Sequence, residues 1–176
     1  PEEANRQMVS NIAELHFTPT MSSLKNLLQE NKDPEKIFVT GNTAIDALKT
    51  TVKEEYDSPV LQWAGDSRIM LLTAHRRENQ GEPLRRIFTA VNKITEKYPD
   101  VRVIYPCHMN PAVRGMAHEI FDGNGKVRLI EPLEVTDFHN LIKKSYLVLT
   151  DSGGIQEEGP SLGKPVLVVR ETTERP

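Results

Sequence analysis

The chain has 176 residues, 38% hydrophobic and 27% charged, a composition typical of a folded globular protein. Its formal net charge of −3 at pH 7 argues against an extended nucleic-acid-binding surface, but leaves room for a local basic site that binds a small anion. The single cysteine, Cys107, excludes an internal disulfide, and no apolar run approaches the ~20 residues that span a bilayer. With no signal peptide visible, we expect a soluble, cytoplasmic protein. The chain begins at Pro1 rather than methionine, so we expect a fragment of a longer protein.

The first third of the chain alternates helix and strand patterns. Helical and strand periodicities predict helices over 3–15, 21–30 and 45–52 and strands over 16–18 and 37–40. Thr20 is the expected N-cap of the second helix. We interpret residues 1–53 as inter-domain and first βα elements. Residues 54–67 carry scattered proline, glycine and aspartate, so we expect an irregular connection there.

From residue 69 onwards, strands and helices alternate without interruption. Short apolar runs predict strands over 69–73, 101–105, 127–130, 147–149 and 166–169. Helical patterns lie between them, over 83–98, 112–121 and 138–145, with a short helix before the last strand. Strands that alternate with helices of about 10–15 residues imply a parallel sheet covered on both faces. The predicted fold class is therefore α/β, a single Rossmann-like domain over 1–176.

The turn between the last two predicted strands has the features of an anion site. Gly153 and Gly154 have no Cβ, so a ligand can approach the backbone, and the positive end of the following helix favours a phosphate. In the alternative interpretation, Asp151 or Ser152 merely caps that helix and the glycines merely make a sharp turn. The motif alone does not separate the two.

Unusual polar residues follow the carboxyl ends of the predicted strands. They lie in residues 73–79, 106–110, 131–133, 151–154 and 170–175. Ligands of open parallel sheets bind beyond the carboxyl ends of the strands, so we expect these loops to converge on one crevice.

Histidine and arginine are adjacent in the first of these loops. The loop places an imidazole beside two guanidiniums, those of His75, Arg76 and Arg77. This set is suited to binding a diphosphate and to donating or accepting a proton near it. Alternatively, His75 caps a helix and the two arginines are solvated partners of Glu78. His108 has a weaker case, because a lone loop histidine is more often structural.

Two further residues have both a binding and a structural interpretation. The Glu158 carboxylate, one turn into the glycine-capped helix, can accept two ribose hydroxyl protons, or simply stabilise the helix by about 0.3–1 kcal/mol. Phe138 can present an aromatic face to a base or pack in the core. The five histidines show no metal-ligand spacing, so we expect no metal site.

Six segments, in this order, resemble the non-hydrolysing UDP-N-acetylglucosamine 2-epimerases, bacterial members in particular. They are Pro1-Glu-Glu-Ala-Asn-Arg6, Val39-Thr-Gly-Asn-Thr43, Thr73-Ala-His-Arg-Arg-Glu-Asn79, Tyr105-Pro-Cys-His-Met-Asn-Pro111, Asp151-Ser-Gly-Gly-Ile-Gln-Glu-Glu158 and Thr172-Thr-Glu-Arg-Pro176. The resemblance runs nearly end to end, with Cys107 where a valine is usual. It implies a glycosyltransferase-B-like fold of two Rossmann-like halves, of which this chain is the C-terminal, UDP-binding half. The N-terminal half, with an arginine-bearing loop and acidic residues for proton transfer, is missing.

The resemblance also implies roles for particular residues. It implies substrate contacts from Leu133 and Phe138 (uracil), Ser152, Gly153 and Gly154 (phosphates), Glu158 (ribose) and Arg175 (nucleotide). It implies catalytic importance for His75, beside the diphosphate, and for Glu2. Activation by the family's own substrate at a neighbouring site is implied for Glu2, Arg76 and His108.

The family interconverts UDP-N-acetylglucosamine and UDP-N-acetylmannosamine. The C2 proton is removed, UDP leaves to give a 2-acetamidoglucal, and UDP adds back with C2 inverted, without a redox cofactor. The resemblance implies a homodimer at full length and an inactive isolated fragment that binds UDP weakly. Two other interpretations stay open: the C-terminal domain of a UDP-sugar glycosyltransferase, which has a similar glycine turn and ribose-binding glutamate, and a nucleotide-binding module without activity.

Overall fold

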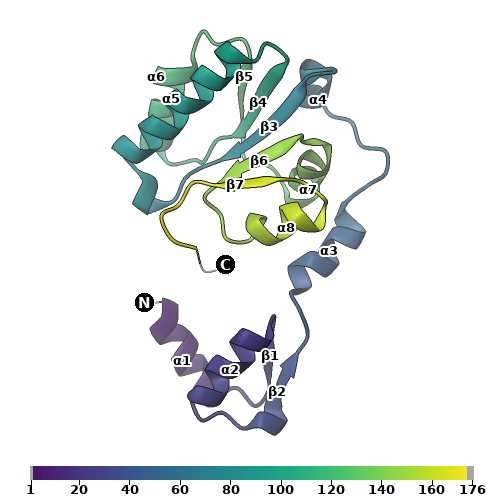
Figure 1. Ribbon diagram of the computed structural model, residues 1–176, viewed down its shortest axis with the longest axis vertical. Helices are drawn as coiled ribbons and strands as arrows, with labels where there is room; N and C mark the ends of the chain where they lie inside the picture. Colours follow the sequence, from purple (N-terminus) through teal and green to yellow (C-terminus); the bar gives the residue numbers. More distant parts are fainter. Residues whose placement is uncertain (1, 174–176) are drawn as a thin grey trace. The chain divides into compact units, whose positions relative to one another are not determined.

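The computed structural model describes residues 2–173, and the chain divides after Asp46 into two compact units (Figure 1). We call residues 1–46 unit 1 and residues 47–176 unit 2. One domain was expected from the sequence. The structure differs because the first two strands pair with each other in a small sheet of their own, while the other five form a second sheet.

Unit 1 is built from two helices and two short parallel strands. Its elements are α1 (Glu2–Ile12), β1 (His16–Thr18), α2 (Met21–Gln29), the 3₁₀ helix η1 (Pro34–Lys36) and β2 (Ile37–Val39), and α3 (Thr43–Thr51) leads into unit 2. The hydroxyl of Thr20 accepts the N–H of Ser23 at 3.2 Å, which confirms the predicted N-cap of α2. In the described part of the chain, α1 buries none of its residues.

Unit 2 contains the strand and helix alternation that the sequence predicted. Its elements are α4 (Pro59–Ala64), β3 (Arg68–Thr73), η2 (Arg77–Asn79), α5 (Glu82–Lys97), β4 (Val101–Pro106), α6 (Pro111–Phe121), β5 (Val127–Ile130), α7 (Val135–Lys144), β6 (Leu147–Thr150), α8 (Ile155–Ser161) and β7 (Val166–Val168). The segment 54–67, expected to be irregular, includes α4. Its start signals are ordinary: Ser58 accepts the N–H of Leu61, and Pro59 occupies the first helical position.

The five strands of unit 2 form a parallel sheet in the order β5-β4-β3-β6-β7 (Figure 1). Successive side chains of β3 enter different cores, because strand residues alternate between the two faces. Met70 and Leu72 pack with the helices α5 and α6, whereas Ile69 and Leu71 pack with α4, α7 and α8. The predicted Rossmann-like sheet with helices on both faces is therefore confirmed.

The strand order reverses direction between β3 and β6. The chain runs outward from β3 through β4 to β5, then crosses to β6 and continues outward to β7. Such a reversal opens a crevice at the carboxyl ends of the two central strands, where α/β proteins bind their ligands. Thr73 and Thr150 end these strands in register, and their hydroxyls lie 2.6 Å apart.

Candidate functional site

A buried aspartate joins the loops that follow β3 and β6. Asp151 is fully buried, and its Oδ2 accepts the backbone N–H groups of His75 at 2.9 Å and Arg76 at 2.8 Å. The same oxygen accepts the side-chain amide of Asn79 at 3.0 Å. Asp151 therefore fixes the path of the loop that carries His75. The interpretation of Asp151 as a cap of α8 is wrong, because its carboxylate faces the β3 loop.

The loop after β7 is hydrogen-bonded to the loop after β3. Asn79 also donates to the carbonyl of Val169 at 3.1 Å, and Nε of Arg170 lies 2.7 Å from Oε1 of Glu78. The loops following β3, β6 and β7 therefore meet at one edge of the sheet. This confirms the predicted convergence for these three loops.

The loop after β4 joins them through two histidines. The rings of His75 and His108 are stacked, with centroids 5.0 Å apart and planes 5° apart. Nδ1 of His108 accepts the N–H of Asn110 at 3.1 Å. In the described residues the nearby helix η2 is preceded by Arg76 and has no side-chain cap, so His75 does not act as a helix cap. The weaker case for His108 is strengthened, because its ring lies against His75.

The surroundings of His75 favour its neutral form. Partial burial lowers the pKa of His75 below its ordinary value of 6.5, and the charge of Asp151 opposes this, while His108 and Arg76 lower the pKa further. The side chain is still 42% exposed, so a ligand can reach the ring. An anion bound beside the imidazole would raise its pKa again, because opposite charge favours the protonated form.

The backbone conformation of Gly154, in the turn before α8, does not require a glycine. This residue has φ −62° and ψ −43°, a right-handed helical conformation that any residue adopts. A Cβ built at Gly154 would lie 3.5 Å from Oε1 of Glu158, which is ordinary van der Waals contact. Within residues 2–173 no side chain caps α8, so neither Asp151 nor Ser152 has the expected capping role. The absence of a side chain at Gly154 is thus better explained by access to the backbone than by the fold.

Glu158 is held by a partner that the sequence did not reveal. Its Oε2 lies 3.6 Å from Nε2 of His139, whose Nδ1 shares a hydrogen bond of 2.8 Å with the hydroxyl of Thr51. His139 is buried, and Asn140 beside it donates to the backbone carbonyl of Thr51 at 2.8 Å. Helix α7 thereby orients a carboxylate of α8. Sequence analysis missed His139 because a histidine among the apolar residues of a helix has no spacing signal that points to Glu158.

The other predicted site residues are Leu133, Phe138, Glu2 and Arg175. Leu133 and Phe138 are partly buried and pack against the core on the α7 side of the sheet, which agrees with the core interpretation of Phe138. Glu2 is an exposed residue at the start of α1 in unit 1. Arg175 lies outside the described residues.

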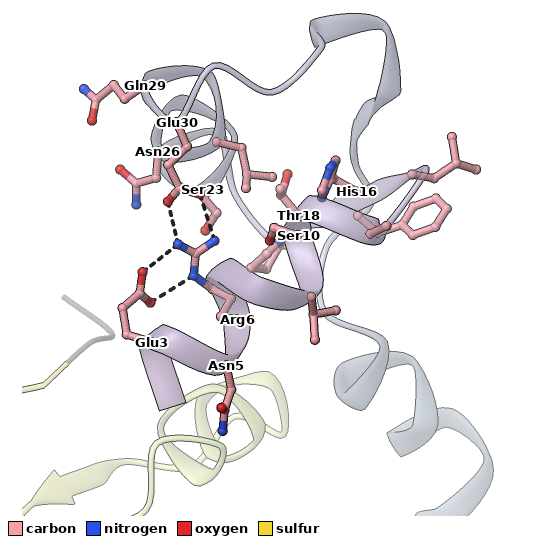
Figure 2. A pocket seen from close by; sticks show the side chains of 16 residues that line it. Glu3, Asn5, Arg6, Ser10, His16, Thr18, Ser23, Asn26, Gln29 and Glu30 are labelled. Carbon is pink, nitrogen blue, oxygen red and sulfur yellow. Dashed lines mark hydrogen bonds and ion pairs between the residues drawn. The ribbon is translucent and has the colours of Figure 1, made fainter. Parts of the chain in front are cut away.

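Unit 1 contains a hollow of about 990 Å³ among α1, β1 and α2 (Figure 2). At its rim, Arg6 lies between two carboxylates, with Nη2 2.6 Å from Glu3 and 2.5 Å from Glu30. The guanidinium holds the pKa of Glu3 at about 2. With its arginine already paired twice, this hollow has little positive charge to offer a diphosphate.

Over residues 2–173, no three histidine, cysteine or acidic side chains are grouped as a metal site requires. No helix in that range is long and apolar enough to cross a bilayer.

The chain matches known proteins over its whole length. A family model described as UDP-N-acetylglucosamine 2-epimerase matches residues 1–176. A UDP-N-acetylglucosamine 2-epimerase of Bacillus subtilis is 60% identical over 176 residues, which cover 100% of this chain and 46% of that protein. The chain thus spans about half the length of the curated relatives it matches, and it corresponds to their C-terminal half.

Two solved structures with bound nucleotides are also similar. A structure described as S. aureus MnaA-UDP has a TM-score of 0.96 and 53% identity, covering 100% of this chain and 48% of that one. The UDP-GlcNAc 2-epimerase of Neisseria meningitidis bound to UDP-GlcNAc has a TM-score of 0.89 and 44% identity, covering 100% and 50%. These matches favour the epimerase interpretation over a UDP-sugar glycosyltransferase.

Proposed function

The chain belongs to the UDP-N-acetylglucosamine 2-epimerase family, and we propose that it is the UDP-binding half of an enzyme that interconverts UDP-N-acetylglucosamine and UDP-N-acetylmannosamine. The observation that carries this proposal is that three elements follow the carboxyl ends of the neighbouring strands β3 and β6. These are the Asp151-fixed loop with His75, the glycine turn at Gly153 and Gly154, and the oriented carboxylate of Glu158.

The diphosphate of the nucleotide binds at the glycine turn. Ser152, Gly153 and Gly154 contact its oxygens, and the start of α8 directs backbone N–H groups at them. His75 lies on the neighbouring loop. When the C1–O bond breaks, negative charge grows on the departing diphosphate, and an imidazole that has taken up a proton stabilises that charge.

The nucleoside is recognised from α8, from α7 and from the loop that precedes α7. Glu158 accepts the two ribose hydroxyls, and His139 keeps its carboxylate in place. Leu133 and Phe138 frame the uracil, and Arg175 adds a further nucleotide contact. A carboxylate suits this task, because hydrogen bonds to a charged acceptor are stronger than those to a neutral one.

The reaction is an elimination followed by an addition. A base removes the C2 proton while the C1–O bond breaks, which releases UDP and leaves a 2-acetamidoglucal. UDP then returns to C1, and a proton is delivered to the opposite face of C2. No electrons are gained or lost overall, so the reaction needs no redox cofactor.

Unit 1 provides the junction with an N-terminal half. Nine of the fifteen exposed large hydrophobic side chains of the described residues belong to this small unit, among them Ile12 (86% exposed) and Phe17 (65%). A two-stranded sheet is marginal by itself, and exposed apolar patches mark interfaces. We assign these side chains to packing against the half that the longer relatives possess.

Further features follow from the family. Glu2 contributes to catalysis, and the family pattern assigns Glu2, Arg76 and His108 each a part in activation by substrate. The full-length protein is a cytoplasmic homodimer without membrane or nucleic-acid partners.

A chimera tests the proposed function. The N-terminal half of the Bacillus subtilis relative is joined to this chain, and deuterium incorporation at C2 of UDP-N-acetylglucosamine is followed in D₂O. We expect incorporation and formation of the N-acetylmannosamine epimer with the chimera, and neither with this chain alone. A folded chimera that binds UDP-N-acetylglucosamine without exchanging C2 would contradict the proposal.

A further inference from the structure

One carboxylate oxygen of Asp151 accepts several hydrogen bonds and the other accepts none within residues 2–173. All three donors described above reach Oδ2. Oδ1 is buried and accepts no hydrogen bond among the described residues, although buried polar atoms are nearly always paired. It faces the ring of His75, whose Nδ1 lies 3.9 Å away. A buried carboxylate oxygen that lies beside an imidazole but accepts no hydrogen bond requires an explanation.

We propose that Asp151 is the positioning residue for His75: its Oδ1 selects the tautomer with the proton on Nδ1 and leaves Nε2 directed at the nucleotide's diphosphate. The catalytic meaning of this inference rests on the proposed function, whereas the tautomer itself does not. In this arrangement Asp151 touches no substrate. It acts through His75, by fixing the ring orientation and by countering the positive charge when the ring is protonated.

The geometry allows the missing hydrogen bond with a small movement. The backbone N–H of His75 already donates a hydrogen bond to Oδ2 of Asp151, and this holds the imidazole near Oδ1. Nδ1 must approach by about 1 Å to reach a normal hydrogen-bond distance. Catalytic hydrogen bonds are often long in ligand-free proteins and tighten when the ligand binds.

The charged groups around His75 give Asp151 a second role. Arg76 on the same loop and His108 on the β4 loop disfavour the protonated imidazole, as does partial burial. Asp151, on the β6 loop, is the acidic group that opposes them. Without its charge, the pKa of His75 would be lowered further.

The alternative is that Asp151 only fixes the loop. Asp151→Asn separates the two roles, because the amide oxygen keeps the acceptor for the three donors while the amide nitrogen replaces Oδ1. That nitrogen donates rather than accepts, so it would force the proton of a neutral His75 onto Nε2. Asn79→Ala removes one of the three donors to Oδ2 and retains the charge of Asp151. Asp122→Asn is the matched control, since it removes another carboxylate that lies 3.0 Å from a histidine Nδ1, that of His118.

Long-range ¹H–¹⁵N NMR spectra of the 176-residue chain test the inference directly. In the wild-type protein we expect neutral His75 to carry its proton on Nδ1. In Asp151→Asn the proton should move to Nε2, and the pKa of His75 should fall by about one unit or more, the scale expected for losing an opposite charge at this distance. Asn79→Ala and Asp122→Asn should leave the tautomer of His75 unchanged.

Two outcomes would overturn the inference. One is an Nε2–H tautomer in the wild-type protein, a measurement that needs no variant and stands even if Asp151→Asn does not fold. The other is a folded Asp151→Asn protein with an unaltered His75 tautomer and pKa. Calorimetry with UDP on the same wild-type sample keeps the two proposals apart, because absent UDP binding would contradict the proposed function and leave the tautomer result intact.

Discussion

Nε2 of His139 lies 3.6 Å from Oε2 of Glu158, and both side chains are largely buried. A carboxylate on α8 is therefore oriented from α7, and the imidazole is oriented in turn by the hydroxyl of Thr51. A carboxylate that is largely buried beside a hydrogen-bonded imidazole suits a binding group better than a helix-stabilising one. This gives Glu158 a role that its position in the first turns of a helix does not explain.

Glu158→Gln should weaken binding of UDP by about tenfold or more and leave binding of inorganic diphosphate unchanged. The variant keeps the shape of the side chain but loses the charge, and hydrogen bonds to charged groups contribute about 1.5–3 kcal/mol. Calorimetric titration of both ligands measures the difference. An equal loss for the two ligands, or a loss for UDP below about twofold, would argue against ribose recognition.

Gly154→Ala should abolish UDP binding without loss of stability. Because the backbone at Gly154 is already right-handed helical, alanine should leave the free energy of unfolding unchanged or raise it by up to about 1 kcal/mol. Its methyl group would occupy the approach to the backbone. Urea unfolding and UDP titration measure the two effects.

Gly163→Ala is the matched control for this variant. Gly163, just after the C-cap of α8, has φ 71°, so alanine there should lower the free energy of unfolding by about 1–2 kcal/mol. UDP affinity per folded molecule should be retained. If Gly154→Ala binds UDP normally, the glycine turn is not the phosphate site.

His75→Asn in the chimera should lower turnover by roughly 10²-fold or more. Asparagine retains a hydrogen-bonding group but cannot become cationic, and this is the scale of a lost proton carrier or transition-state donor. The melting temperature and the turnover are measured on one preparation. A variant that melts earlier but turns over normally per folded molecule would refute the catalytic role.

The stability of the chain should fall as the pH drops below about 6.5, in part because of His75. Its pKa is lowered in the folded state, so the unfolded state binds more protons in this range and gains stability from them. His75→Asn should reduce the loss of unfolding free energy between about pH 7.5 and about pH 5.5. Urea unfolding of both proteins at the two pH values measures this difference. An identical pH dependence in both would show that His75 titrates alike in the folded and unfolded chain.

The sequence predicted most of the fold because the strands of unit 2 are short apolar runs with clear ends. The strand at 127–130 agrees in both bounds, and the polar residues after β3, β4, β6 and β7 lie in loops that meet. The helix α4 was missed, although Ser58 and Pro59 are ordinary start signals, because the surrounding glycine and aspartate residues suggested a loop. The division after Asp46 depends on which strands pair, and strand pairing is not encoded in the local pattern.

The site was only partly predictable for the same reason. His75 and Glu158 were identified from their own segments, but their partners are distant in sequence. Asp151 reaches His75 because β3 and β6 are neighbours in the sheet, and His108 stacks on His75 because β4 lies on the other side of β3. Local rules for helix starts allowed a capping role for Asp151, but in the structure its carboxylate accepts from the loop after β3 instead.

Calorimetric titration of UDP into the 176-residue chain tests the central claim most directly, that this chain carries the nucleotide-binding crevice of the epimerase. We expect saturable binding that is weaker than in the full-length relatives, since this chain spans only about half of their length. Uridine, which lacks the diphosphate, should bind more weakly still. A folded chain that shows no saturable heat with UDP would contradict the account.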